Sequence, residues 1–185
     1  MDFPQRGRCL CNAVEYSLTE DPVTVYICHC TDCQRQTASA FAMTMMVRSD
    51  ALDLVRGEPE HYAVEMSDGR IKEADFCSRC STRLWGPFGV DRLTVLEPGS
   101  LDETSWFRPV GHIWLRSAQP WVAIPDGDLK FKKDPGEDEA ENRNDKPHFL
   151  KMSGYRCHEE PASLNDPPRT GRPQKRGPAH RDQGS

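Results

Sequence analysis

Short apolar and polar runs, rather than long helical repeats, make up most of the chain before residue 116. Residues 13–18 alternate apolar and polar side chains with a period of two, which is typical of a half-buried strand. One segment, residues 31–39, is instead predicted to be a short helix, with Thr31 or Asp32 able to cap its first amides. Further strands, separated by glycine and proline turns, are expected at residues 23–27, 41–47, 52–55, 61–64, 71–76, 82–85, 92–96 and 112–115. The pattern predicts a mainly β domain with one short helix.

The apolar pattern stops near residue 133. After Asp134 there is no Val, Ile or Trp, and seven of the fifteen prolines of the chain lie in this remainder. Such a segment buries too little apolar surface to offset the entropy of ordering it. We therefore expect a single folded domain at residues 1–133 and a Pro-rich, charged, disordered tail at residues 134–185.

Charge and hydropathy exclude some classes of partner. The formal net charge is −5, so no overall basic field favours nucleic acid. No apolar run is long enough to span a membrane, and the first residues do not resemble a signal peptide, which favours a cytoplasmic chain without excluding the nucleus. The tail is acidic at residues 134–141 and basic at residues 169–181, so it is either a solvated extension or an arm for a charged protein partner.

The strongest chemical signal is a cluster of three cysteines, Cys28, Cys30 and Cys33. In extended backbone a Cys-x-Cys places both sulfurs on one side, and Cys33 can complete a three-sulfur face from the start of a turn or helix. Such a face suits a soft or borderline cation, most often zinc. His29 lies between the two alternating sulfurs and should point away from them, as a core residue or one that supports the ligands.

Four more cysteines form two close pairs, Cys9 with Cys11 and Cys77 with Cys80. Four sulfurs would close a structural zinc site, whereas three leave a position open for water or substrate. Spacing alone also permits Cys28 and Cys30 to join Cys77 and Cys80, and either partition gives one saturated and one unsaturated site. Disulfides and a thioredoxin-like redox pair are the competing interpretations, as are two structural zinc sites with water or His29 completing the second. Cys157, in the tail, is expected to be an exposed thiol.

Together these motifs resemble the glutathione-dependent formaldehyde-activating enzyme family, also called the centromere protein V family. The resemblance spans about residues 5–133 and rests on Gly7-Arg8-Cys9-Leu10-Cys11-Asn12-Ala13-Val14, Cys28-His29-Cys30-Thr31-Asp32-Cys33, Phe76-Cys77-Ser78-Arg79-Cys80-Ser81-Thr82 and His112-Ile113-Trp114 with Pro120-Trp121. It implies a zinc-stabilised β-tent of short antiparallel strands with two zinc ions per chain. The structural zinc would be held by Cys9, Cys11, Cys77 and Cys80, and the catalytic zinc by Cys28, Cys30 and Cys33.

The chain departs from the family pattern at four positions. Members of the family commonly have glycine where this chain has Asn12, Ala38 and Ser81, and a basic residue where it has Gln34. Asparagine tolerates the left-handed backbone that glycine may supply, whereas alanine and serine do so less readily. Gln34 and Ala38 lie on the predicted helix beside the three-cysteine site, so substrate preference can differ there.

The resemblance implies a zinc-dependent carbon–sulfur lyase that acts on a thiol–aldehyde adduct such as S-hydroxymethylglutathione, with glutathione as co-substrate. His29, Gln34 and Arg35 are near the open position in sequence and are expected to move a proton or hold the glutathione carboxylates, with Arg35 the natural carboxylate partner. The alternative is a non-enzymatic zinc module whose tail binds a partner, because a fold does not fix a function.

Overall fold

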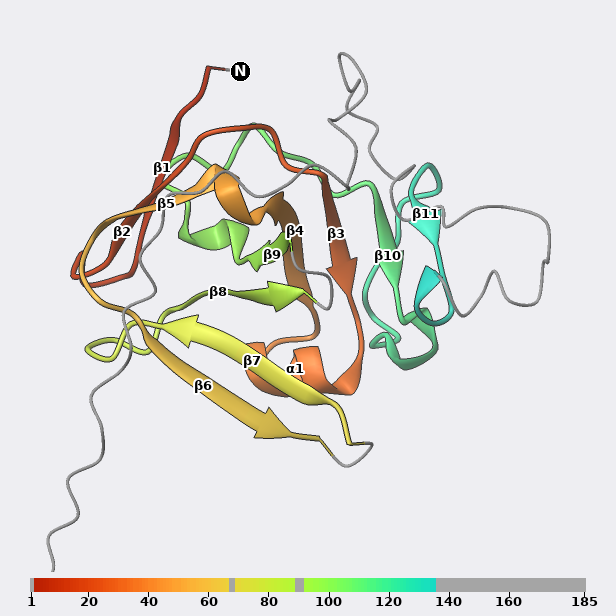
Figure 1. Cartoon of the computed structure of the whole chain (residues 1–185). Helices are drawn as coiled ribbons and strands as arrows, with labels where there is room; N and C mark the ends of the chain where they lie inside the picture. Colours follow the sequence, from red (N-terminus) through yellow and green to blue (C-terminus); the bar gives the residue numbers. More distant parts are fainter. Residues whose placement is uncertain (1, 67–68, 89–91, 136–185) are drawn as a thin grey trace, which may run out of the picture.

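The computed structural model describes residues 2–66, 69–88 and 92–135, and these residues form two β-sheets. The smaller sheet has three strands in the order β1 (Gln5–Arg8), β2 (Glu15–Leu18) and β5 (Leu52–Arg56), and both ladders are antiparallel. Gly7 of β1 lies against the ring of Tyr16, where a side chain larger than hydrogen would collide. This sheet lies at one end of the molecule (Figure 1).

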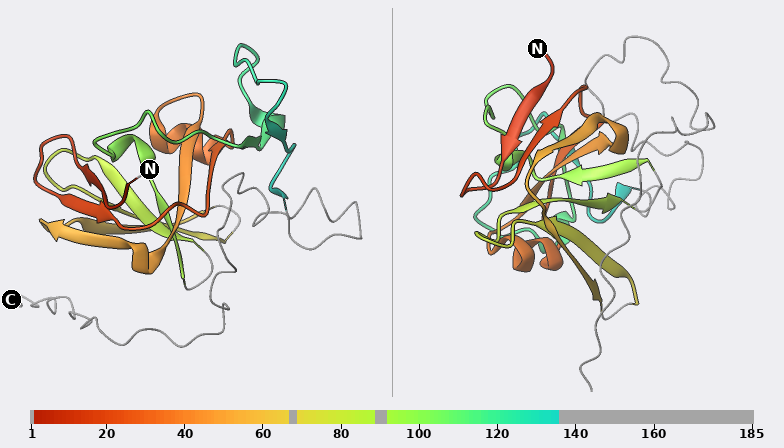
Figure 2. Two further views of the ribbon diagram at one scale, coloured as in Figure 1. Left: turned by 90° about the horizontal axis from the view of Figure 1, so that it is seen from above. Right: turned by 60° about the vertical axis from the view of Figure 1, so that its left-hand side comes forward.

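The larger sheet has eight strands in the order β11-β10-β3-β4-β9-β8-β7-β6. Its ladders are antiparallel except at one edge, where β10 pairs in parallel with both β3 and β11. This edge lies at the opposite end of the molecule from β1 and β2 (Figures 1 and 2). The strands are β3 (Thr24–Cys28), β4 (Ala42–Arg48), β6 (Glu60–Glu65), β7 (Ile71–Phe76), β8 (Arg83–Phe88), β9 (Leu93–Leu96), β10 (Gly111–Ile113) and β11 (Leu129–Lys130).

The described residues contain one α-helix, α1 (Thr31–Thr37), between β3 and β4. It begins at Cys30, whose side chain accepts the Cys33 amide as an N-cap, and it ends at Ala38 in a left-handed conformation. Three 3₁₀ turns complete the set: η1 (Ser49–Ala51), η2 (Pro98–Ser100) and η3 (Leu115–Ser117). In the described part of the chain no helix has the length and apolar character to cross a membrane.

The central strand β4 is buried on both faces and divides the core into two clusters. Met45 and Val47 pack into the main cluster, which joins the two sheets and includes Cys9 and Cys77. Met46 packs on the other face with Tyr26, Cys28 and Ile113. The three-cysteine segment therefore adjoins the smaller cluster, while Cys9 and Cys77 of the four-cysteine set are part of the larger one and Cys80 packs against it.

The mainly β class with one short helix is confirmed. Every predicted strand is present within a few residues of its expected bounds, and the helix ends at Thr37 rather than residue 39. The sequence pattern missed β1 and β11. Both are edge strands, and charged side chains in β1 and the two-residue length of β11 give no alternating apolar signal. The predicted tail, with Cys157, falls mostly outside the described residues, so the domain boundary stays a prediction.

Candidate metal sites and the cavity beside them

Two groups of cysteines come together in space, and they divide the seven described cysteines as the resemblance implies. The first group joins the β1–β2 loop to the β7–β8 loop and consists of Cys9, Cys11, Cys77 and Cys80. The second consists of Cys28, Cys30 and Cys33. Within each group the sulfur atoms lie within 4.8 Å of one another. The alternative pairing of Cys28 and Cys30 with Cys77 and Cys80 is not what the structure shows.

The four-cysteine group has the dimensions of a tetrahedral zinc site. A Zn–S bond of about 2.3 Å places two sulfurs of a tetrahedron about 3.8 Å apart. Sγ of Cys11 lies 3.6 Å from Sγ of Cys9 and 3.8 Å from Sγ of Cys77. The residues therefore fit a zinc ion, because thiolates are the ligands that structural zinc prefers.

Polar groups around two of these sulfurs, those of Cys9 and Cys80, lower the thiol pKa and so favour the thiolate form that a metal requires. The Val14 amide donates to Sγ of Cys9 at 3.3 Å. The hydroxyl of Thr82 lies 3.2 Å from Sγ of Cys80, and this hydrogen bond lowers the pKa of the Cys80 thiol to about 5. The same hydroxyl oxygen accepts the Leu10 amide at 3.1 Å, which ties the two cysteine loops together.

All three residues that replace a family glycine have left-handed backbone. The φ angles are 59° at Asn12, 49° at Ala38 and 59° at Ser81. Asn12 and Ser81 each follow the second cysteine of their loop and donate their amides to the carbonyls of Cys9 and Cys77. The left-handed conformation is thus present at all three positions, although none of them has glycine, the residue that adopts it most easily.

The three-cysteine group lies where β3 meets α1. Cys28 is the last residue of β3, Cys30 is the N-cap of α1, and the Cys33 amide donates to Sγ of Cys30 at 3.3 Å. Hydrogen bonds from Cys28 and Cys33 lower the pKa of the Cys30 thiol to about 2. One sulfur of the group thus holds negative charge readily, and a bound cation would offset the charge of all three.

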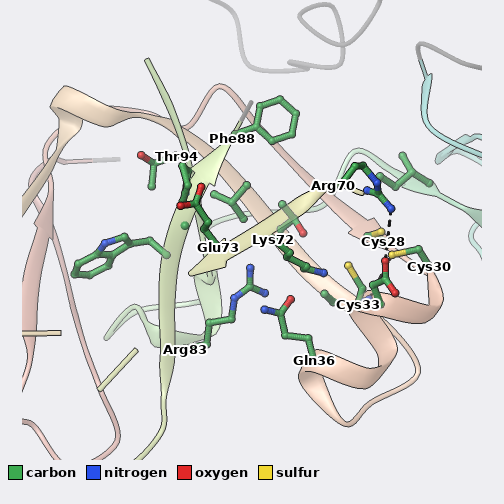
Figure 3. Close-up of a pocket in the computed structure, with 18 of the residues that line it drawn as sticks. Cys28, Cys30, Cys33, Gln36, Arg70, Lys72, Glu73, Arg83, Phe88 and Thr94 are labelled. Carbon is green, nitrogen blue, oxygen red and sulfur yellow. Dashed lines mark hydrogen bonds and ion pairs between the residues drawn. The ribbon is translucent and has the colours of Figure 1, made fainter. Parts of the chain in front are cut away.

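A cavity of about 1400 Å³ opens onto the three-cysteine group. Its lining is mixed in character: apolar residues such as Trp85, Phe88 and Trp114 alternate with charged residues of both signs. Besides Arg116, three cationic side chains line it, those of Arg70, Lys72 and Arg83, which come from the segment leading into β7 and from β7 and β8. They face the sulfurs across the cavity (Figure 3).

These cations differ in how they are held. Arg70 lies 3.7 Å from Asp32 of α1, so it spans the cavity above the sulfurs. Arg83 pairs with Glu97 at 2.6 Å, and both side chains are largely buried. Lys72 extends toward Cys33 (Figure 3), and its positive charge adds to the hydrogen bonds that lower the pKa of Cys30. A ligand that carries carboxylates and a thiol would find charges of the right sign here.

His29 is completely buried and points away from the cavity, as its position between two alternating cysteines predicted. Its Nε2 atom lies 2.9 Å from Nδ1 of His112, which is also buried. Burial, and then the neighbouring His112, lower the pKa of His29, so the ring is held neutral. His112 in turn lies 3.1 Å from Asp128 through its Nε2 atom.

The other two predicted site residues on α1 do not line the cavity. The Gln34 amide donates to the carbonyls of His29 and Ser117 and accepts from Gln119, so it links α1 to the segment after β10. Arg35 is exposed on α1. Their roles with glutathione stay predictions.

Sequence reasoning missed the cationic wall of the cavity. Arg70 and Lys72 come shortly before Cys77, but nothing in their spacing connects them to Cys28, more than forty positions earlier. Only the antiparallel strand order β4-β9-β8-β7 brings them opposite α1. The available signal was weak, because it consisted only of two basic side chains a few residues before a cysteine motif.

Comparison with known proteins gives a family match and a similar solved structure. None of the curated proteins matches the chain. A crystal structure of a Rhodobacter sphaeroides protein is similar at 17% identity, covering 68% of this chain and 98% of that one, with a TM-score of 0.42. The family model described as glutathione-dependent formaldehyde-activating enzyme matches residues 4–117, which is more than half of the sequence. The chain therefore belongs to the glutathione-dependent formaldehyde-activating enzyme family.

Proposed function

We propose that the chain is a zinc-dependent carbon–sulfur lyase that acts on a thiol–aldehyde adduct such as S-hydroxymethylglutathione. Family membership supports the reaction class. The observation that carries the proposal is the position of the cavity: it is lined by Cys28, Cys30 and Cys33, and none of the four other described cysteines lines it. A metal held by three residues beside a large cavity keeps a position for a ligand, whereas a metal held by four does not.

The reaction needs little rearrangement of bonds. In one direction the thiol sulfur forms a bond to the aldehyde carbon, the π pair of the carbonyl moves to oxygen, and that oxygen takes a proton. In the other direction the hydroxyl loses its proton and the C–S bond breaks. A zinc ion held by Cys28, Cys30 and Cys33 would favour the thiolate form of the substrate sulfur near neutral pH.

The residues of the cavity wall suit the remaining tasks. The ammonium group of Lys72 faces the sulfurs and can hydrogen-bond the oxygen of the adduct, where negative charge develops. Arg70, already positioned by Asp32, can hold a carboxylate of the peptide thiol. Trp114 and Phe88 also line the cavity and give it apolar surface. The cytoplasm is the compartment that fits this function, because every cysteine that would bind zinc must stay reduced.

The test compares wild type with Cys30→Ser and Lys72→Met for zinc content, glutathione binding and exchange between free formaldehyde and the adduct, followed by NMR. Serine is a good N-cap, so Cys30→Ser should keep α1 while losing one metal ligand. We expect two zinc ions per chain in wild type and one in Cys30→Ser, with glutathione binding and catalysed exchange lost. Lys72→Met should keep both zinc ions and bind glutathione about tenfold more weakly, a loss of roughly 1.4 kcal/mol.

The result that contradicts the proposal is also defined. If wild type holds two zinc ions but added thiols change neither binding signals nor the exchange rate, the lyase function is wrong. The alternative, a zinc module that binds a partner through residues 134–185, would then be the better hypothesis. If a chain without residues 134–185 keeps the wild-type rate of formaldehyde exchange, the tail takes no part in catalysis.

A further inference from the structure

A buried chain of hydrogen bonds runs behind the three-cysteine group, on the side away from the cavity. It connects Asp128, just before β11, to His112 of β10 at 3.1 Å, and His112 to His29 at 2.9 Å. The two imidazole rings are nearly parallel, with centroids 5.2 Å apart and 20° between their planes, and they meet edge to edge through this hydrogen bond. His29 is 0% exposed and His112 is 3% exposed.

The direction of this chain follows from its last member. An ionised carboxylate can only accept, so Nε2 of His112 carries the proton that is donated to Asp128. Nδ1 of a neutral His112 then has a free lone pair, which accepts a hydrogen bond from the N–H group at Nε2 of His29. Asp128 therefore fixes the tautomer of both rings, as an outer carboxylate fixes a metal-binding histidine.

The backbone of His29 is held as firmly as its ring. Its amide donates to the carbonyl of Ile113 at 3.0 Å. Its carbonyl accepts the amide group of Gln34 at 2.7 Å and the hydroxyl of Ser117 at 3.0 Å. Since His29 lies between Cys28 and Cys30, these bonds fix the backbone from which two of the three sulfurs project.

We propose that His112 and Asp128 are positioning residues for the three-cysteine group: by fixing His29 they hold Sγ of Cys28 and Sγ of Cys30 in the arrangement that binds metal. This inference rests on the proposed function only for the metal at Cys28, Cys30 and Cys33. A site with three protein ligands has one fewer bond to offset the entropy of ordering them, so it depends more on a fixed backbone than the four-cysteine site does.

The experiment measures zinc affinity at the two sites separately, by competition with a chelator, in His112→Leu, Asp128→Ala and His112→Asn. Cobalt replaces zinc in a parallel series, because its absorption spectrum distinguishes four sulfur ligands from three. Tyr16→Phe is the matched control, since it removes another buried hydrogen bond, 2.7 Å to Ser100, away from this site. Imidazole ¹⁵N shifts of His29 and His112 report the tautomers.

We expect His112→Leu to weaken metal binding at the three-cysteine site about tenfold to a hundredfold and to leave the four-cysteine site unchanged. Asp128→Ala, at a partly exposed position, should have a smaller effect and change both tautomers. His112→Asn should restore part of the affinity, because its amide oxygen can take the place of Nδ1. Tyr16→Phe should retain both sites.

Two results overturn the inference. Wild-type affinity at the three-cysteine site in both His112→Leu and Asp128→Ala would show that the hydrogen-bonded chain does not position the ligands. Equal weakening of both sites would show a general loss of fold. A wild-type protein that binds one metal ion only would instead refute the metal site itself, and the proposed function with it.

Discussion

At the scale of single residues, the clearest strain in the chain lies at its left-handed non-glycine positions. Ala38 ends α1 at φ 49° and ψ 37°, and its amide closes the helix on the carbonyls of Arg35 and Gln34. An L-residue other than asparagine or aspartate pays about 1–2 kcal/mol for this conformation. The helix tolerates the cost because the last turn must reverse here to lead the chain into β4.

Replacing Ala38 by glycine should therefore stabilise the protein. Glycine adopts φ 49° without the Cβ penalty, although it also gains entropy in the unfolded chain, which offsets part of the benefit. We expect the free energy of unfolding of Ala38→Gly to rise by about 0.5–1 kcal/mol in denaturant titrations with excess zinc. Ala118→Gly is the control, because Ala118 has φ −62° and glycine should be destabilising there. Equal effects of the two substitutions would show that strain at Ala38 is absent.

Single residues also mark the limit of what the sequence reveals about the site. The metal ligands could be predicted because cysteine spacing reports local geometry directly: Cys28, Cys30 and Cys33 are neighbours in any fold that extends and then turns. Lys72 could not be predicted to face them, since its position depends on strand order in the large sheet. His29 was expected to point away from the metal, but its partner His112 becomes a neighbour only through the parallel pairing of β10 with β3.

At the scale of elements, the alternating pattern predicted the strands well and their pairing not at all. Strands β2 to β10 each carry a local signal, whereas the order β11-β10-β3-β4-β9-β8-β7-β6 is set by long-range packing around β4. The hairpin of β6 and β7 illustrates this difference between predicting a strand and predicting its pairing. β6 is an edge strand with mostly exposed side chains, so its stability depends on cross-strand contacts with β7 rather than on burial.

One of those contacts makes the stability of the hairpin depend on pH. His61 of β6 lies 2.8 Å from Asp75 and 3.3 Å from Glu73 of β7. The hydrogen bond to Asp75, with smaller contributions from Glu73, raises the pKa of His61 above its ordinary value of 6.5. The protonated ring is thus favoured in the folded state, and its contribution is complete below pH 6.5 and is lost as pH rises through the folded pKa.

We expect His61→Asn to lower the free energy of unfolding, and to lower it more at pH 6 than at pH 8. The effect should be small, because the His61 side chain is 50% exposed. Arg8→Gln is the control, because it removes an exposed ion pair with Asp102 that contains no histidine. A difference for His61→Asn that is constant from pH 6 to pH 8, or that grows with pH, would contradict the assignment.

At the scale of the whole molecule, the two cysteine groups have different positions relative to the core. The four-cysteine group joins the loop of the small sheet to a loop of the large one, across 66 positions of sequence between Cys11 and Cys77. Cys9 and Cys77 are themselves buried in the main core cluster. The three-cysteine group lies at the end of β3, beside a cavity, and its ligands all come from residues 28–33, so it does not link the two sheets.

This difference predicts opposite consequences of removing a ligand. Zinc bound by four cysteines contributes about 10–16 kcal/mol of apparent binding energy, comparable to the whole stability of a domain. Cys77→Ser should therefore lose the fixed packing of the tryptophans, seen as a collapsed near-ultraviolet circular dichroism signal, together with at least one zinc ion. Cys80→Ser, at a less buried position, tests the same site without placing a hydroxyl in the core. Cys30→Ser should retain the spectrum while losing one zinc ion.

The comparison separates a metal that holds the fold from a metal that serves the cavity. If Cys77→Ser and Cys80→Ser keep a native spectrum with one zinc ion, the sheets do not need the ion, and packing around Cys9 and Cys77 is sufficient. If Cys30→Ser unfolds as well, the three-cysteine group is structural and its open side has no consequence for function. Loss of fold in Cys77→Ser and Cys80→Ser, together with loss of thiol binding but not of fold in Cys30→Ser, is the outcome that agrees with the geometry, because four protein ligands close a zinc site whereas three leave a coordination position for a thiol.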